Sequence, residues 1–290
     1  MATVNELLDR VQDLPALPGP ALRIINILNN PDTDLNEVER IIKTDEAIAM
    51  TVLRYANSAR YGRPGRTFSL RESIARLGTK TLMKIALQCQ ICPMFSQTGT
   101  SYGLQLGAMQ RGSLAGAIAA EEIARDLELE PELCFLGALL RDVGKIVLDM
   151  FATPEEMAEA ASYSDTSASF LQIEEQVFGA NHAEIGAELA SRWNLPERII
   201  EAIRRHHSPQ PPGEEFNDPV CDVVHAADVI CLWTGIATGF DGLQYPLAAH
   251  VRDGILGTRD RAEYYMTNMW ARLTEAEAEM NADTAKGMTA

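Results

Sequence analysis

The 290-residue sequence is poor in aromatic side chains, which make up 6% of it, while Ala, Leu, Ile and Glu are abundant. This composition favours helices over sheets. No uninterrupted apolar stretch reaches the ~20 residues of a membrane-spanning helix. The first residues, Met1 to Glu6, lack the basic start and apolar segment of a secretory signal peptide. These absences predict a soluble, cytoplasmic protein that does not act at a membrane.

Basic residues are also in deficit, because 25 Lys and Arg stand against 41 Asp and Glu, for a formal net charge of −16. Such a chain is not suited to nonspecific binding of DNA or RNA, which needs a positive surface. The segment from Arg54 to Lys84 is an exception, with eight basic residues and the single acid Glu72. A solvated helix face followed by a loop is the simpler interpretation. The alternative is a local site for an anionic ligand or an acidic partner.

Cysteine is scarce, and the five cysteines are an odd number spread over the chain, as expected for reduced thiols in a reducing compartment. Cys89 and Cys92 form a CxxC pattern inside a helical segment, but no second CxxC accompanies it. We therefore interpret the pair as core residues. The other cysteines are Cys134, Cys221 and Cys231.

Helix signals recur throughout the chain. Capping boxes begin at Asp34 and Ser69, a similar start begins at Asn181, and apolar residues then recur three and four positions apart. We find no convincing run of alternating strand residues and predict an all-α fold. The predicted helices span 4–12, 19–29, 35–43, 45–58, 70–77, 79–95, 104–127, 131–149, 167–178, 182–193, 196–207, 219–236 and 259–277.

A polar break at Ser96–Ser101 separates two helical blocks. We predict an N-terminal helical subdomain over 1–97, a second helical subdomain over 98–277 and a flexible tail over 278–290. Near the end of the second block, Tyr264, Tyr265, Met269 and Trp270 recur at helical spacing. Packing against the protein's own core is the favoured interpretation, and a partner or homodimer surface is the alternative.

The most informative motif is Arg141-Asp142-Val143-Gly144-Lys145, which follows the apolar run 134–140. It has the form of a metal-hydrolase motif in which the leading histidine is replaced by arginine. Arginine cannot bind a metal, because it stays protonated and offers only hydrogen-bond donors. The motif therefore indicates a catalytic fold that has lost its catalysis.

Three of the five histidines stand where a helical metal site needs them. His182 begins one predicted helix, and His206 and His207 end another; Asp142 and Asp228 add two carboxylates. Carboxylates and neutral imidazoles are the usual ligands of Mn, Fe, Zn and similar ions. Each residue taken alone has a structural explanation, such as a cap or a favourable helix dipole, but the set in this order indicates a site.

Over roughly residues 14–236, the sequence resembles the HDOD family, the HD-related output domain of bacterial signalling proteins. The N-terminal block carries the resemblance through several short motifs, and the second block carries it through the histidine-bearing segments. The matching segments are Leu14–Pro18, Asp45–Met50, Leu53–Ala59, Tyr61–Gly62, Ser69–Leu70, Ser73–Ile74, Arg76–Gly78, Phe178–Gly179, His182–Gly186, Trp193–Pro196 and Ile203 before His206 and His207.

The resemblance implies an all-helical HD-like bundle related to phosphohydrolases, including HD-GYP cyclic-dinucleotide phosphodiesterases, which hold one or two metals with the order H…HD…H…HH…D. In this chain Gly112 stands at the first histidine and Arg141 at the histidine of the HD pair. Asp142 is retained, with its frequent companion Lys145. The later ligand positions are His182, His206, His207 and Asp228. We expect Arg141 to pair with Asp142 or Asp228 as a structural bridge.

The sequence thus predicts a noncatalytic regulatory module without a cofactor, acting through other signalling proteins, including components of a cyclic-dinucleotide pathway. One alternative is a residual metal-dependent phosphohydrolase or single-metal sensor, with one divalent transition metal on Asp142, His182 and His206 or His207. A second alternative is a nucleotide-binding regulator without turnover. Its basis is a loop in which three arginines flank two glycines: Arg60, Arg63, Arg66, Gly62 and Gly65.

Overall fold

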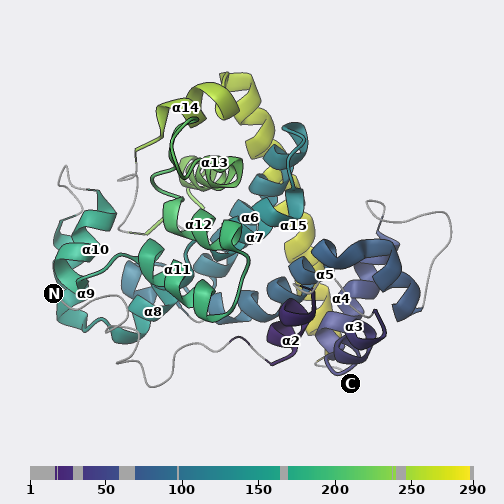
Figure 1. Cartoon of the computed structure of the whole chain (residues 1–290). Helices are drawn as coiled ribbons and strands as arrows, with labels where there is room; N and C mark the ends of the chain where they lie inside the picture. The colour runs from purple at the N-terminus through teal and green to yellow at the C-terminus, as the bar shows by residue number, and fades with distance from the viewer. Residues whose placement is uncertain are drawn as a thin grey trace.

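A computed structural model describes residues 17, 19–28, 35–58, 69–96, 98–163, 169–236, 238–239 and 246–287. Every regular element in these ranges is a helix (Figure 1), which confirms the predicted all-α fold. Across the same ranges, none of the helices combines the length and apolar character needed to cross a bilayer.

The N-terminal block contains α2 (Gly19–Leu28), α3 (Leu35–Ile42), α4 (Glu46–Asn57) and α5 (Leu70–Phe95). Helix α4 begins where the Asp45 side chain accepts a hydrogen bond from the amide of Ile48. These four helices bury a common apolar cluster. Its fully buried members include Ile24, Val38, Ile48, Val52 and Ile74.

Helix α5 is two helices joined at Gly78, whose φ of 75° and ψ of 169° lie outside the helical region. Glycine tolerates this positive φ because it has no Cβ. The prediction of separate helices over 70–77 and 79–95 is therefore correct. Beyond the kink, Leu87, Ile91 and Phe95 belong to a second and larger apolar core, so α5 connects the two cores.

The larger core is built around two helices, α6 (Ala108–Asp126) and α7 (Pro131–Leu140). Alanines at 115, 117, 119, 120 and 124 make α6 slim enough to be buried on most of its surface. Helices α12 (Glu197–Arg205), α13 (Pro219–Trp233) and α15 (Arg259–Gly287) pack directly on this pair. The remaining elements of the block are η1 (Thr100–Tyr102), α8 (Val143–Phe151), α9 (Pro154–Ser162), α10 (Phe170–Phe178), α11 (His182–Arg192), α14 (Ala249–Val251) and η2 (Arg252–Leu256).

Several predicted boundaries differ from the structure. The helix predicted over 131–149 is broken at Arg141 and Asp142, because the backbone of Asp142 (φ −98°, ψ 12°) leaves the helical region before α8 begins. Helix α9 was not predicted, although Thr153 and Glu156 form a capping box at its start. Helix α15 continues to Gly287, beyond the predicted end at 277. The helix predicted over 4–12 lies outside the described residues.

Helix α15 packs along α6, and Tyr265, Met269 and Leu273 are fully buried there. The favoured interpretation of the C-terminal aromatic residues is thus correct for Tyr265 and Met269. Tyr264 and Trp270 remain partly exposed, and their use by a partner stays a prediction.

One buried carboxylate joins the two blocks. Glu121 of α6, fully buried, accepts hydrogen bonds from Lys84 of α5 at 2.6 Å and from Arg272 of α15 at 2.6 Å. The Lys84 ammonium also lies 3.9 Å from the centroid of the Phe135 ring. Paired and hydrogen-bonded on several sides, this buried charge ties three helices to one another.

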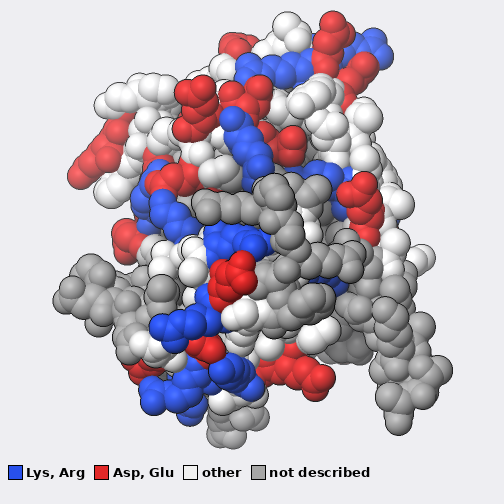
Figure 2. All heavy atoms as spheres, turned by 90° about the vertical axis from the view of Figure 1, so that its right-hand side faces the viewer, with Lys and Arg blue, Asp and Glu red and all other residues white. Residues whose placement is uncertain are grey.

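Figure 2 shows the face on the right-hand side of Figure 1, where Lys and Arg side chains are spread from the top to the bottom of the view with Asp and Glu side chains among them. Within the described part of the basic segment, acids from other helices balance several of these cations. Arg71 pairs with Glu39 of α3, and Lys80 pairs with Glu130. The arginines of the predicted anion-binding loop, Arg60, Arg63 and Arg66, lie outside the described residues.

Candidate functional site

The buried guanidinium of Arg141 lies between two carboxylates at the junction of α7 and α8. Its Nε donates to Oδ1 of Asp228 at 2.7 Å and lies 3.3 Å from Oδ2 of Asp142. Nη1 donates to the backbone oxygen of Ala138 at 2.9 Å. The neighbouring acids raise the pKa of Arg141 against the opposing effect of burial, so the guanidinium remains charged.

Asp142 lies at the centre of this charge network. Burial alone would raise its pKa, but the charges of Lys145 and Arg141 outweigh burial and hold the pKa well below its usual range. The Lys145 ammonium lies 3.0 Å from Oδ1 of Asp142. Asp142 is therefore ionised at neutral pH, and two fixed cations balance its charge.

A second cluster on the other side of Asp142 consists of three buried imidazoles. Nε2 of His182 lies 3.3 Å from Nε2 of His206 and 3.0 Å from Nε2 of His207. The same nitrogen lies 3.7 Å from Oδ1 of Asp142. The structure thus brings together all three histidines that the sequence singled out, although they come from α11 and from the end of α12.

Hydrogen bonds to the second ring nitrogen fix the orientation of two of these imidazoles. Nδ1 of His182 lies 2.6 Å from Oε2 of Glu174, and Nδ1 of His206 lies 2.6 Å from the backbone oxygen of Ile203. Both partners are acceptors, so each Nδ1 carries the proton and each Nε2 presents a lone pair. A carboxylate or carbonyl on the far nitrogen is the usual second partner of a metal-binding histidine.

Two of these imidazoles, those of His206 and His207, are neutral in this arrangement. Burial and the neighbouring His182 lower the pKa of His206 to about 3, and burial followed by the other histidines lowers the pKa of His207. Neutral imidazole is the form that binds a metal. His225 is buried nearby, where Nδ1 lies 2.7 Å from the backbone oxygen of His206. Its Nε2 accepts a hydrogen bond from the amide of Ala248, so it supports the cluster from outside.

Two glycines allow α8 and α11 to approach closely enough to form the site. A Cβ on Gly144 would collide with the backbone oxygen of His182 and with the amide of Gly186. The close approach places His182, at the start of α11, beside Asp142, at the start of α8. Position 144 must therefore be glycine for α8 and α11 to pack this closely.

The side of the site that faces α6 lacks imidazoles. Gly112 contributes only its backbone oxygen, 3.5 Å from Nη2 of Arg141. A small cavity of about 20 Å³ lies here, lined by Gly112, Ser113, Arg141 and Asp228 among others. A cation of the protein itself, Arg141, thus fills the half of the site that contains Gly112 and Asp228.

The two halves differ in what they can hold. The three imidazoles suit a single divalent transition metal, because their ligand atoms all lie within 4.8 Å of one another and are nitrogen donors. A second ion beside Asp228 does not fit, because the fixed charge of Arg141 lies against that carboxylate. His207 contributes to the first half and also lies 3.7 Å from Oδ2 of Asp228.

Sequence reasoning missed the groups that orient the site. Glu174 is fully buried on α10, and its carboxylate accepts hydrogen bonds from the backbone amide of His182 at 2.9 Å and from the hydroxyl of Tyr102 at 2.8 Å. Gly116 of α6 leaves the space in which the Arg141 guanidinium lies. The spacing of eight residues between Glu174 and His182 matches no known motif, so it could not predict their contact. An acidic residue among the apolar residues of Phe170–Phe178 could have indicated a buried carboxylate.

The fold and the buried histidine cluster are those of an HD-like helical protein. Residues 14–209 match the HDOD domain family, and the chain belongs to this family.

The solved structure of an HDOD domain protein of unknown function from Geobacter sulfurreducens is 26% identical and has a TM-score of 0.66. The match covers 96% of this chain and 95% of that one. A similar curated relative is an uncharacterized protein of Treponema pallidum (strain Nichols), 29% identical over 220 residues, which are 75% of this chain and 42% of the relative. Ribonuclease Y of Aquifex aeolicus (strain VF5) is 25% identical over 166 residues, 55% of this chain and 23% of that enzyme. The chain thus spans less than half the length of these curated relatives.

Proposed function

We propose that this protein is a noncatalytic regulatory module of the HDOD family, which transmits signals through contacts with other signalling proteins. The observation that carries the proposal is the position of Arg141, whose Nε lies 2.7 Å from Asp228 and 3.3 Å from Asp142. Both carboxylates are engaged by a cation that cannot leave. Phosphodiester hydrolysis in a two-metal site needs those carboxylates for metal ions that clamp the attacking and leaving oxygens.

The network around Arg141 supports a structural role. A buried ion pair need not add stability, but removal of one partner leaves an uncompensated charge in the core. The guanidinium uses its Nε and Nη1 on protein acceptors, so replacement by a metal would require several simultaneous rearrangements.

The test is a hydrolysis assay on the full chain, with bis-p-nitrophenyl phosphate, a cyclic dinucleotide and single-stranded RNA as substrates. RNA is included because one relative is named ribonuclease Y. Each substrate is incubated with metal-free protein and with added Mn, Fe, Zn or Mg. We expect no turnover above that of a denatured control. Sustained, metal-dependent turnover that disappears in Asp142→Ala would overturn the proposal.

A second candidate is a single-metal sensor, or a residual metal-dependent hydrolase, at His182, His206 and His207. The contact between His182 and His206 favours this candidate. Both Nδ1 atoms carry protons, so the two Nε2 atoms, 3.3 Å apart, direct lone pairs at each other. A proton on His207 can satisfy one of these contacts, whereas a bound cation would satisfy all three nitrogens. In a hydrolase the ion would supply an activated water.

Elemental analysis separates the two candidates. The untagged protein is purified without chelators, exposed to Mn, Fe, Zn or Mg and desalted. About one ion per chain that is lost in His182→Ala and His206→Ala would establish the sensor site. The matched control is His250→Ala, because His250 lies on another helix and pairs with Asp222 at 2.9 Å. Absence of stoichiometric metal from the wild-type protein would eliminate the second candidate.

A further inference from the structure

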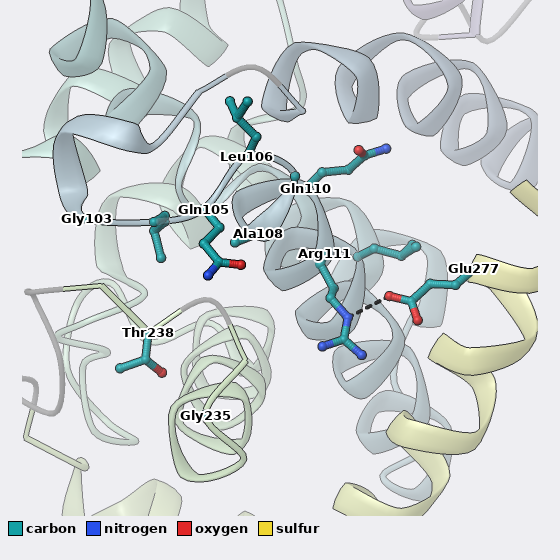
Figure 3. A pocket seen from close by; sticks show the side chains of 12 residues that line it. Gly103, Gln105, Leu106, Ala108, Gln110, Arg111, Gly235, Thr238 and Glu277 are labelled. Carbon is teal, nitrogen blue, oxygen red and sulfur yellow. Dashed lines mark hydrogen bonds and ion pairs between the residues drawn. The ribbon is translucent and has the colours of Figure 1, made fainter. Parts of the chain in front are cut away.

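A pocket lies outside the histidine cluster, at the beginning of α6 (Figure 3). Its volume is about 690 Å³, which is within the range of sites for small organic ligands. The loop before α6, the turn after α13 and the end of α15 form its walls. Apolar and amide side chains alternate around it, including Leu104, Leu106, Leu114, Gln105 and Gln110.

The charged side chains in the described lining are Arg111 and Glu277, which face each other from α6 and α15. Nε of Arg111 donates to Oε1 of Glu277 at 2.6 Å. The two side chains are 40% and 36% exposed, so a ligand in the pocket can reach the pair. The guanidinium carbon also lies 4.9 Å from the centroid of the Trp270 ring, which orients Arg111 independently of Glu277.

The small cavity over Arg141 shares Leu104 with this pocket, and its lining residues Gly112 and Ser113 directly follow Arg111 on α6. The Ser113 side chain is almost completely buried, and its hydroxyl has no hydrogen-bond partner within the described structure. The cavity has room for about one water molecule. The small cavity beside the pocket therefore offers an unsatisfied polar group, the Ser113 hydroxyl.

We propose that this pocket binds a small phosphate-bearing molecule the size of a mononucleotide, whose phosphate pairs with Arg111 in place of Glu277. A guanidinium binds phosphate through two parallel hydrogen bonds, and a dianionic phosphate competes well against one carboxylate. Gln105 and Gln110 supply amide donors and acceptors for the polar edge of the ligand, and the leucines contact its remainder. The site needs no metal at the histidine cluster and stands whether or not the module is catalytic.

Glu277 then acts as an internal competitor, and its displacement has a limited structural effect. Upstream of it, Arg261 pairs with Asp126 at 2.6 Å, and Arg272 pairs with Glu121 at 2.6 Å. These two anchors hold α15 on α6 whether or not Glu277 is engaged. Ligand binding would consequently loosen only the part of α15 that follows Arg272, which gives the pocket a route to a partner surface.

The first test is isothermal titration calorimetry of the full chain with AMP and GMP. Adenosine and guanosine are the uncharged controls, and inorganic phosphate is the minimal anion. We expect a nucleotide to bind more tightly than phosphate and the nucleosides not to bind. Arg111→Gln should weaken binding more than tenfold, because a charge-assisted bond is lost. Arg111→Lys, which keeps the charge but loses the planar fork, should give an intermediate affinity.

Glu277→Gln provides the sharper test because it removes the competitor. We expect the nucleotide affinity to increase about two- to fivefold, the range of a partly exposed ion pair. The matched controls Arg259→Gln and Glu263→Gln alter another ion pair on the same helix, remote from the pocket, and should leave affinity unchanged. Circular dichroism establishes that each variant is folded.

Hydrogen–deuterium exchange measures the displacement directly, and we expect faster exchange after Arg272 in the nucleotide complex. The proposal is overturned if no nucleotide binds at millimolar concentration, or if folded Arg111→Gln binds as well as the wild type. It is also overturned if Glu277→Gln weakens binding, or if bound nucleotide leaves exchange in that segment unchanged or slower.

Discussion

Gly116 of α6 faces the guanidinium of Arg141 with no side chain between them. An added Cβ would lie 3.0 Å from Cζ of Arg141 and closer still to Nη1. The guanidinium cannot move away, because Asp228 and the backbone oxygen of Ala138 hold it. The arginine that stands at the histidine position of the HD pair is thus matched by a glycine one helix away.

The first prediction concerns this match. Gly116→Ala should lower the free energy of unfolding by about 1–3 kcal/mol, the usual range for overpacking a buried site. Urea denaturation of the variant measures the loss. The double variant Gly116→Ala/Arg141→Ala should lose less than the sum of the two single variants, because the clash disappears with the guanidinium. Gly19→Ala is the control, since nothing lies within 4 Å of an added Cβ there.

The second prediction concerns the charge of Arg141. Arg141→Met keeps an unbranched side chain but leaves Asp228 without its closest cation, so the unfolding free energy should fall by about 3–5 kcal/mol. Chemical denaturation at neutral pH checks this value. A stability equal to that of the wild type would mean that the carboxylates find other partners, and it would remove the structural role of the guanidinium.

The third prediction concerns pH. Burial lowers the pKa of His206 to about 3 and also lowers the pKa of His207 and His225, whereas unfolded histidine titrates near 6.5. Between these values the unfolded chain takes up protons that the folded protein excludes. The stability contribution is therefore complete above pH 6.5 and decreases as the pH falls toward the folded pKa.

For the metal-free protein, each proton that the folded state excludes lowers the free energy of unfolding by about 1.4 kcal/mol for every pH unit below 6.5, down to the folded pKa. Urea midpoints measured from pH 7.5 to pH 5 should decrease progressively. In His206→Gln the dependence should be shallower by about one proton. A midpoint that rises as the solution is acidified would contradict the burial of neutral imidazoles.

The fourth prediction concerns the thiols. Burial raises the pKa of Cys92, Cys134, Cys221 and Cys231 to about 12, so almost no thiolate forms at pH 8. Iodoacetamide should modify these four residues only after unfolding in urea. Cys89 is less buried and should react first, as mass spectrometry of digested samples can determine. Rapid labelling of Cys134 in the folded protein would contradict the prediction.

Much of the fold was readable from the sequence because its signals are local. Caps at Ser69 and Asn181 and apolar spacing located most helices, and the predicted break between residues 77 and 79 coincides with the kink at Gly78 in α5. The division at Arg141 and Asp142 was not predicted, because apolar residues resume after it at helical spacing, at Val143, Ile146 and Val147. It arises where the chain turns from α7 into α8 and presents both charged side chains to the site.

The site was predictable in its members but not in its arrangement. The order of motifs identified His182, His206, His207, Asp142 and Asp228, and the structure brings these residues together. The choice of partner for Arg141 stayed open because pairing depends on how α7 and α13 pack. The pair of Arg111 and Glu277 was not readable at all, since the residues are 166 positions apart and neither belongs to a motif.

The bridge made by Arg141 also bears on how this lineage can evolve. A substitution of Arg141 by histidine would remove the closest cation of Asp228 and would leave glycine at 112. This single change would therefore lower stability without completing a set of ligands for two metals. The ion pair of Arg141 with Asp228 therefore opposes the restoration of a two-metal site in this chain by any single substitution at position 141.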